Sequence, residues 1–319
     1  MRFITNISTD PYYNMALDEY CLEQYECSET FFYLWRNRPS VIIGLNQNAY
    51  SEVNLAYLED HDIRLARRVT GGGAVYHDLQ NLNYSIVGRS VDAGIFASAL
   101  RKLGLDAELT GRNDIFVGGR KVSGYARRVW KDREIIHGTL MYDVDIETLT
   151  EALNVKGSKL EAKGIASVRS RVANVKELLP RFASLDDLQA ELLAILSNGD
   201  AELPFADEQK AEVAKIAQQK FATWEWIYGH SHQADFVCSA KLPCGRVDAE
   251  ISLDRGRIKD LHFSGDFVGG LPAARLEDAL KGLRYDETEI LTALQGEDVP
   301  ASFDATDASQ LTRLIMNKY

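Results

Sequence analysis

Cysteine is scarce in this sequence. The four present, Cys21, Cys27, Cys238 and Cys244, show none of the Cys-x-x-Cys spacing that zinc and redox sites use. Because an unpaired cysteine usually behaves as a small hydrophobic side chain, we interpret them as reduced and mostly structural. The sequence therefore gives no sign of a zinc or disulfide-exchange site.

Long apolar runs and an excess of basic residues are also missing. No window approaches the roughly 18 to 20 apolar residues that a membrane span needs, and the start, MRFITNISTDPYYNMALDEY, lacks the basic-then-apolar order of a signal peptide. The net charge is -11, whereas a protein that binds nucleic acid normally presents a basic surface. We therefore expect a cytoplasmic protein that binds neither membranes nor nucleic acid, with a monomer as the default state.

The remaining composition is that of a folded protein, with 45% hydrophobic and 26% charged residues. A single core tends to stop growing near roughly 250 to 300 residues, so a chain of 319 residues predicts one large domain and one small domain. Periodicity is lost around residues 229–245, and clean alternation of apolar and polar residues begins at residue 246. We place the boundary near residue 240, which divides the chain into 1–240 and 241–319.

Strand-like and helix-like runs alternate through the first two thirds of the chain. Runs of β-branched and aromatic residues bounded by turn signals predict strands at 31–36, 40–44, 63–68, 81–87, 114–117, 121–130 and 134–142. Helices are predicted at 12–25, 52–60, 92–103, 145–153, 184–197 and 206–220. Beyond residue 245, strands at 246–254 and 258–263 precede helices at 273–283, 286–294 and 307–316. The expected fold class is α+β, with a large mixed-sheet domain followed by a small α+β domain.

The most informative run is RRVTGGGAVYHD at residues 67–78. Because glycine lacks a Cβ atom, the backbone N–H groups of such a loop can approach an anionic ligand closely. The run is neither a Walker A loop nor the G-x-G-x-x-G fingerprint of dinucleotide-binding proteins. Three glycines alone would suit a plain strand connection equally well. The adjacent arginines and the His-Asp pair favour a phosphate or carboxylate cradle.

Three further runs carry polar side chains among small residues. In residues 111–126, Lys121 follows a Gly-Gly hairpin, and its ammonium group could attract both a carboxylate and the α-phosphate of ATP. Asp114, with Asn113 beside it, could hold Mg²⁺, which usually takes only one or two protein carboxylates. The other runs are HGTLM, which begins at His137, and KGIASVRSRVAN at 163–174. Taken singly, a strand lysine is usually solvated and a lone histidine is usually structural.

Together the four runs resemble the lipoate-protein ligase family. The family pattern is R-R-x-x-G-G-G-A-V-x-H-D, then G-R-N-D, R-K-x-S-G, H-G-T-L and K-G-I-x-S-V-R-S-R-V-x-N. The resemblance covers residues 35–226 and, more loosely, continues to residue 267; Gln80, where glycine is usual, is a departure that removes no functional group. It implies that the large domain has the mixed-sheet fold shared with biotin ligases and that a small accessory domain follows.

The resemblance also implies roles for the matching positions. ATP-binding residues would be Arg68, Gly73, Ala74, Val75, Tyr76 and Lys121. Lipoate-binding residues would be Gly72, His77 and Lys121, with Lys121 also the catalytic residue. Asp114 would hold Mg²⁺, and Asn113, Asn83 and His137 would support the site. The implied reaction activates lipoate with ATP to lipoyl-AMP, releases pyrophosphate, and transfers the lipoyl group to a lysine of a lipoyl-domain protein. The implied acceptors are the E2 subunits of 2-oxoacid dehydrogenases and the H protein of the glycine cleavage system.

Other activities stay open at this point. An ATP-independent transferase could move lipoyl or octanoyl between carrier proteins, but such enzymes use a cysteine nucleophile and no cysteine lies in the four runs. A biotin ligase would carry a different glycine and arginine loop. A carrier that binds lipoate or a nucleotide without turnover is a third alternative. Two basic stretches, 112–133 and 156–176, could steer an acidic acceptor domain.

Overall fold

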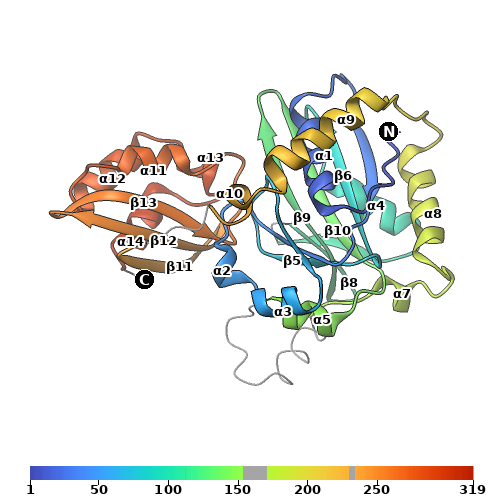
Figure 1. Ribbon diagram of the computed structural model, residues 1–319, viewed down its shortest axis with the longest axis horizontal. Helices are drawn as coiled ribbons and strands as arrows, with labels where there is room; N and C mark the ends of the chain where they lie inside the picture. Colours follow the sequence, from blue (N-terminus) through green and yellow to red (C-terminus); the bar gives the residue numbers. More distant parts are fainter. Residues whose placement is uncertain (112, 154–170, 230–233, 319) are drawn as a thin grey trace.

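The computed structural model describes residues 1–111, 113–153, 171–229 and 234–318, which form a larger and a smaller part (Figure 1). A seven-stranded sheet runs through the larger part. In spatial order its strands are β1 (Arg2–Phe3), β2 (Phe31–Trp35), β6 (Asn81–Gly88), β10 (Arg133–Met141), β9 (Arg120–Trp130), β8 (Asp114–Val117) and β7 (Ala107–Thr110). A second sheet has the order β4 (Arg64–Arg67), β3 (Ser40–Ile43) and β5 (Val75–His77).

Both sheets contain parallel and antiparallel pairs. In the larger sheet only β1 pairs in parallel with its neighbour β2, and the other adjacent strands are antiparallel. In the second sheet β3 pairs in parallel with β4 and antiparallel with β5. The predicted α+β fold with a mixed sheet is thus confirmed.

Helices cover both faces of the large sheet, which explains the unbroken apolar run of β2. Phe32 and Leu34 pack into a core with α4 (Gly94–Lys102) and α8 (Leu185–Ser197). On the other face, Phe31, Tyr33 and Trp35 pack into a core with α1 (Pro11–Glu23) and α9 (Asp207–Ile216). Because successive strand side chains point to opposite faces, a strand covered on both sides is apolar throughout.

Helix α1 lies deep in this second core. Asp10 caps its N-terminus by accepting hydrogen bonds from the backbone N–H groups of Tyr12 and Tyr13. From Asn14 to Leu22 every residue of the helix is buried. A helix buried on all sides brings its polar side chains into the protein interior, where each needs a partner. Asp18 is one of these side chains.

The remaining helices of the larger part are short. They are α2 (Ala49–Glu52), α3 (Leu55–Asp60), α5 (Ile146–Ala152), α7 (Val175–Leu178), η1 (Ala217–Phe221) and α10 (Trp224–Ile227). The helix predicted at 206–220 is in fact α9 followed by the π-helical turn η1. Strands β5 and β7, each of three or four residues, were not predicted because so short a run carries little periodicity.

The smaller part contains a three-stranded antiparallel sheet of β11 (Phe236–Leu242), β12 (Gly245–Asp254) and β13 (Arg257–Gly265). Its helices are α11 (Ala274–Leu280), α12 (Glu287–Gln295), α13 (Val299–Ser302) and α14 (Ala308–Ile315). The non-periodic reading of 229–245 missed β11, an edge strand of which only Cys238 and Leu242 are buried. The boundary at 240 stays a prediction, although residue 240 lies within this strand.

Backbone hydrogen bonds join the two parts beside the glycine-rich segment. The N–H of Gly72 donates to the carbonyl oxygen of Phe267 at 2.9 Å, and the N–H of Gly265 donates to that of Asn46 at 3.1 Å. Arg246 forms an ion pair with Glu52 of α2. The smaller part therefore contacts the loop that the sequence identified as a cradle.

Among the residues placed by the structure, no helix combines the length and apolarity needed to cross a lipid bilayer.

Candidate active site

The glycine-rich run forms a loop between β4 and β5. Gly72 has φ of +92°, a conformation that favours glycine. A Cβ atom on Gly44, at the end of β3, would lie only 2.0 Å from the carbonyl oxygen of Gly72. The loop can therefore approach β3 this closely only because position 44 has no side chain.

The first of the two arginines before the glycines holds the backbone segments that surround this loop. The Arg67 guanidinium is completely buried and donates to the carbonyl oxygens of Gly44, Leu45, Gln47, Trp226 and Ile227.

Arg68 donates to the carbonyl oxygens of Ile42, Gly71 and Gly73 and to Oγ1 of Thr70. Burial, together with the charge of Arg67, lowers the pKa of Arg68 to about 10, so it remains charged at neutral pH. Arg68 thus holds the loop, while its predicted contact with a nucleotide stays a prediction.

A cavity of about 290 Å³ lies beside the loop and brings together residues from distant runs. Every residue predicted for the site except Asp114 lines it, namely Arg68, Gly72, Gly73, Ala74, Val75, Tyr76, His77, Asn83, Asn113, Lys121 and His137. Apolar side chains that the sequence did not single out also line it, among them Met15, Trp35, Ile42, Met141, Leu149 and Leu153. They resemble ordinary core residues, so no local pattern could have identified them. The cavity can take a ligand with an apolar body and an anionic end.

Lys121 and Asp114 form an ion pair at the edge of this cavity. Nζ of Lys121 lies 2.7 Å from Oδ1 of Asp114, and both side chains are more than a quarter exposed. Asp114 is paired across the sheet with Gly124, and a Cβ atom on that glycine would lie 2.9 Å from Nζ of Lys121. The backbone of Lys121 also joins the end of the fourth run, donating to Arg171 and accepting from Ala173. The rest of that run, 163–170, lies outside the described residues.

His77 is buried and neutral. Burial, with smaller contributions from Arg68 and His137, lowers its pKa to about 3. Its Nδ1 lies 3.1 Å from Nδ2 of Asn37, whose Oδ1 accepts a hydrogen bond from Asn14. Asn37 therefore donates to Nδ1, and the proton of the neutral ring resides on Nε2. This Nε2 has no hydrogen-bond partner within the described part of the chain, which makes it a donor available to a ligand in the cavity.

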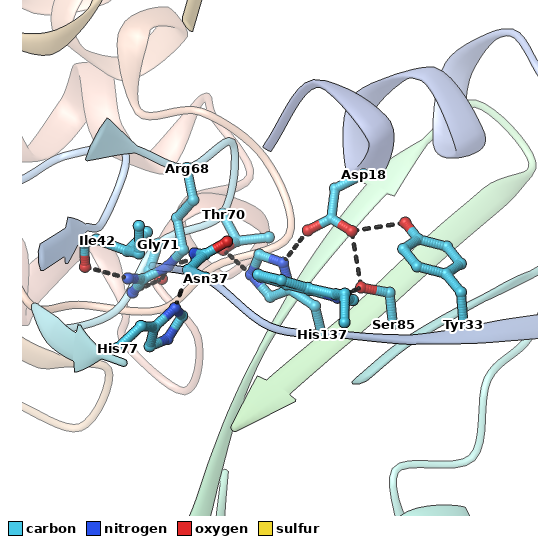
Figure 2. A network of polar contacts seen from close by, with 11 residues as sticks. Asp18, Tyr33, Asn37, Ile42, Arg68, Thr70, Gly71, His77, Ser85 and His137 are labelled. Carbon is cyan, nitrogen blue, oxygen red and sulfur yellow. Dashed lines mark hydrogen bonds and ion pairs between the residues drawn. The ribbon is translucent and has the colours of Figure 1, made fainter. Parts of the chain in front are cut away.

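His137 joins a chain of buried polar groups (Figure 2). Its Nδ1 lies 2.5 Å from Oδ2 of Asp18, and its Nε2 lies 2.6 Å from Oγ1 of Thr70. Tyr33 and Ser85 donate to the other oxygen of Asp18, at 2.6 and 2.7 Å. The sequence pointed to His137 but not to Asp18, which lies 119 positions earlier in the chain.

At the edge of the cavity, the carboxylate of Asp114 is the candidate ligand for Mg²⁺. Within the ranges covered by the structure, no three His, Cys, Asp or Glu side chains converge on one point. Mg²⁺ is commonly held by one or two carboxylates together with substrate phosphates, so the single carboxylate of Asp114 fits such a site.

Much of the basic stretch at 112–133 is paired with carboxylates. Arg120, Lys121, Arg127 and Arg128 form ion pairs with Glu177, Asp114, Glu134 and Glu23, in that order. Most of the other stretch, 156–176, lies outside the described residues. Glu23, Glu134 and Glu177 lie outside the stretch, so they reduce the positive field expected from counting its charges.

Comparisons with known proteins assign both parts of the chain. Residues 10–197 match the family described as the lipoyl protein ligase A/B catalytic domain, and residues 231–315 match the bacterial lipoate protein ligase C-terminus. The lipoate-protein ligase LplJ of Bacillus subtilis is 37% identical over 319 residues, which cover 95% of this chain and 96% of that protein. Lipoate-protein ligase 1 of Staphylococcus aureus is 38% identical over 329 residues, covering 99% and 100%.

Solved structures agree with this assignment. The crystal structure of P. falciparum LipL1 in complex with lipoate has a TM-score of 0.82 and covers 100% of this chain and 99% of its own; at 23% identity it shows the fold alone. A bipartite lipoate protein ligase from Thermoplasma acidophilum, described with its E2 lipoyl domain, has a TM-score of 0.65 at 29% identity and covers 74% and 98%. Lipoate-protein ligase A bound with ATP has a TM-score of 0.62 at 29% identity and covers 72% and 98%.

Proposed function

The chain belongs to the lipoate-protein ligase family, and on that premise we propose that it joins lipoate to a lysine of a lipoyl-domain protein at the expense of ATP. The observation that carries the proposal is the cavity in which Lys121, the glycine-rich loop and the donor Nε2 of His77 meet an apolar lining. Such a cavity suits an acid with a hydrocarbon body, whose carboxylate would reach Lys121. The related ligase with bound ATP supports a nucleotide in the same reaction.

A free carboxylate does not acylate an amine at neutral pH, because its oxygen is a poor leaving group. In the proposed first step the lipoate carboxylate attacks the α-phosphorus of ATP, and pyrophosphate leaves. Lys121 would stabilise the negative charge that develops between the carboxylate and the α-phosphate. Gly73, Ala74, Val75 and Tyr76 would line the nucleotide, while Gly72 and His77 would contact the lipoyl group. Asn83, Asn113 and His137 would support these contacts.

In the second step the ε-amine of the acceptor lysine attacks the acyl carbon of lipoyl-AMP, and AMP leaves. Orientation of the two reactants would supply much of the rate. When bound, Mg²⁺ would neutralise phosphate charge, and Asp114 would hold it. The E2 subunits of 2-oxoacid dehydrogenases and the glycine cleavage H protein are the proposed acceptors; the archaeal ligase described with its E2 lipoyl domain supports the first of these. The monomeric state and cytoplasmic location stay predictions from the sequence.

The ATP-independent transferase is less well supported. All four cysteines are described, and none lines the cavity. Burial raises the pKa of Cys21, which keeps it a thiol at neutral pH and makes it a poor nucleophile. In the described part of the chain, the cavity therefore lacks the cysteine nucleophile that such transferases use.

Lipoate-dependent exchange between ATP and pyrophosphate tests the function directly. We expect exchange in the wild type and its loss in Lys121→Ala. Lys176→Ala is a matched control, since Lys176 also pairs with an aspartate, Asp143, but does not line the cavity. A wild type that binds lipoate without exchange would support the transferase or the carrier instead.

A further inference from the structure

A continuous chain of hydrogen bonds connects the buried carboxylate of Asp18 to the glycine-rich loop (Figure 2). Asp18 is 1% exposed, His137 6%, Thr70 1% and Arg68 6%, so the whole chain is shielded from water. From Asp18, the contacts run to Nδ1 of His137, from its Nε2 to Oγ1 of Thr70, and from there to Nε of Arg68 at 3.0 Å. Arg68 in turn holds the carbonyl oxygens of Gly71 and Gly73.

The chemistry of the two ends sets the direction of the two outer bonds. A guanidinium can only donate, so Oγ1 of Thr70 accepts from Arg68; an ionised carboxylate can only accept, so Nδ1 of His137 donates to Asp18. A neutral imidazole protonated at Nδ1 has an acceptor at Nε2, which matches the hydroxyl hydrogen of Thr70. The arrangement with a single imidazole proton places that proton on Nδ1, facing Asp18, and has the Thr70 hydroxyl donate to Nε2.

Hydrogen-bond donors surround the buried carboxylate of Asp18. Its Oδ1 accepts from the hydroxyls of Tyr33 and Ser85, and Trp35 donates to Ser85 at 2.9 Å, which leaves the Ser85 hydroxyl hydrogen for Asp18. A buried carboxylate without such partners would cost several kcal/mol. Tyr33, Ser85 and His137 contact this carboxylate from three different strands, which indicates that its position is closely controlled.

We propose that Asp18 is a positioning residue of the adenylation reaction, which fixes the glycine-rich loop through His137, Thr70 and Arg68. Asp18 does not line the cavity, whereas His137 and Arg68 do. Because Arg68 holds the carbonyl oxygens of the loop, a change at Asp18 would alter the loop's geometry without touching a ligand. The expected effect of Asp18 on the reaction rate rests on the proposed function, whereas the proton positions in the hydrogen-bond chain do not.

The proton arrangement can be tested without any activity. In the full-length protein labelled with ¹⁵N-histidine, we expect the His137 ring to show a protonated Nδ1 and an unprotonated Nε2 at pH 7.5, with His137→Gln identifying the signals. Thr70→Val should leave Nδ1 protonated and shift Nε2. A ring protonated only at Nε2, or at both nitrogens, would overturn the assigned direction of the chain.

Exchange kinetics test the positioning role. We expect Asp18→Asn to raise the KM for ATP and lower kcat, with at least a tenfold loss of kcat/KM, since small displacements of reacting groups can cost about a hundredfold. Thr70→Val, which breaks the same chain, should give a similar loss. Because both changes break one chain, the double variant should be no more than about threefold worse than the poorer single variant. Losses that multiply would overturn the proposal.

Glu134→Gln is the matched control. Glu134 is also a buried carboxylate, on the same strand as His137, but it pairs with Arg127 and does not line the cavity. We expect this variant to lower the midpoint of urea unfolding and to keep kcat/KM within about threefold of wild type. An Asp18→Asn variant that behaves in the same way would show a purely structural role. If the wild type itself shows no exchange, the proposed function fails, but the ¹⁵N measurement still tests the hydrogen-bond chain. If Asp18→Asn does not fold, the kinetics of Thr70→Val and the wild-type ¹⁵N spectrum test the proposal instead.

Discussion

Nζ of Lys121 lies 2.7 Å from Oδ1 of Asp114, and the two atoms lie within 3.3 Å of the place where a Cβ atom would project from Gly124. The ion pair thus occupies space that only glycine leaves open at position 124. In the proposed reaction Lys121 has to exchange this aspartate for the substrate carboxylate and the α-phosphate. The pair is partly exposed, so the exchange costs little, because solvent-exposed ion pairs contribute only about 0 to 1 kcal/mol.

Gly124→Ala should impair catalysis more than folding. The new methyl group would meet Nζ and Cε of Lys121 at 2.9 and 3.0 Å, and these atoms are the far end of a flexible side chain that can move aside. We expect at least a tenfold loss of kcat/KM in ATP-pyrophosphate exchange, because the displaced ammonium no longer faces the reacting groups. Urea unfolding should change by less than about 1 kcal/mol. Unchanged exchange would argue against the observed position of Lys121 as the catalytic one.

Asp114→Asn should change the dependence on Mg²⁺. The substitution keeps the shape of the side chain but removes the charge that would hold the metal. We expect the Mg²⁺ concentration for half-maximal exchange to rise at least several-fold, with partial recovery of the rate at high Mg²⁺. Asp143→Asn, which removes the partner of Lys176, is the control. The same Mg²⁺ dependence in both variants would reduce Asp114 to a counter-ion of Lys121.

His77 should make folding sensitive to acid. Its pKa is lowered from 6.5 to about 3 in the folded protein by burial, whereas the unfolded chain takes up a proton near the ordinary pKa. Between pH 6.5 and 3 the unfolded state binds more protons than the folded state. The contribution of His77 to stability is therefore complete above pH 6.5 and is lost as the pH falls toward 3. The slope approaches about 1.4 kcal/mol per pH unit.

Urea unfolding of the wild type and His77→Gln between pH 7.5 and 4.5 measures this contribution. We expect the variant to be less stable at pH 7.5, because a buried hydrogen bond with Asn37 changes, but to lose less stability on acidification. Parallel pH profiles for the two proteins would show that His77 titrates normally in the folded state.

The sequence identified most regular elements because their signals are local. Ser184 followed by Asp187 is a helix-start signal readable in the sequence, and in the structure the two residues form a reciprocal capping box at the start of α8. Gly118-Gly119 forms the predicted turn between β8 and β9, and both residues have positive φ. Strand β11 was missed because it lies at a sheet edge and only Cys238 and Leu242 are fully buried, so its sequence shows no clear alternation.

The sequence by itself determined the α+β class, the order of the motifs, the family and most of the polar side chains that line the cavity. Each of these depends on residue type, periodicity or spacing along a short segment. The tertiary structure alone decided what these residues contact: that Lys121 pairs with Asp114, that Arg68 holds the loop, and that Asp18 of α1 reaches His137 of β10. The first two contacts join residues that are near each other in the sequence, and they depend on the backbone conformation of a hairpin and a loop. The third depends on how elements from distant parts of the chain pack together, because a buried polar group takes whichever partner the fold brings within hydrogen-bonding distance.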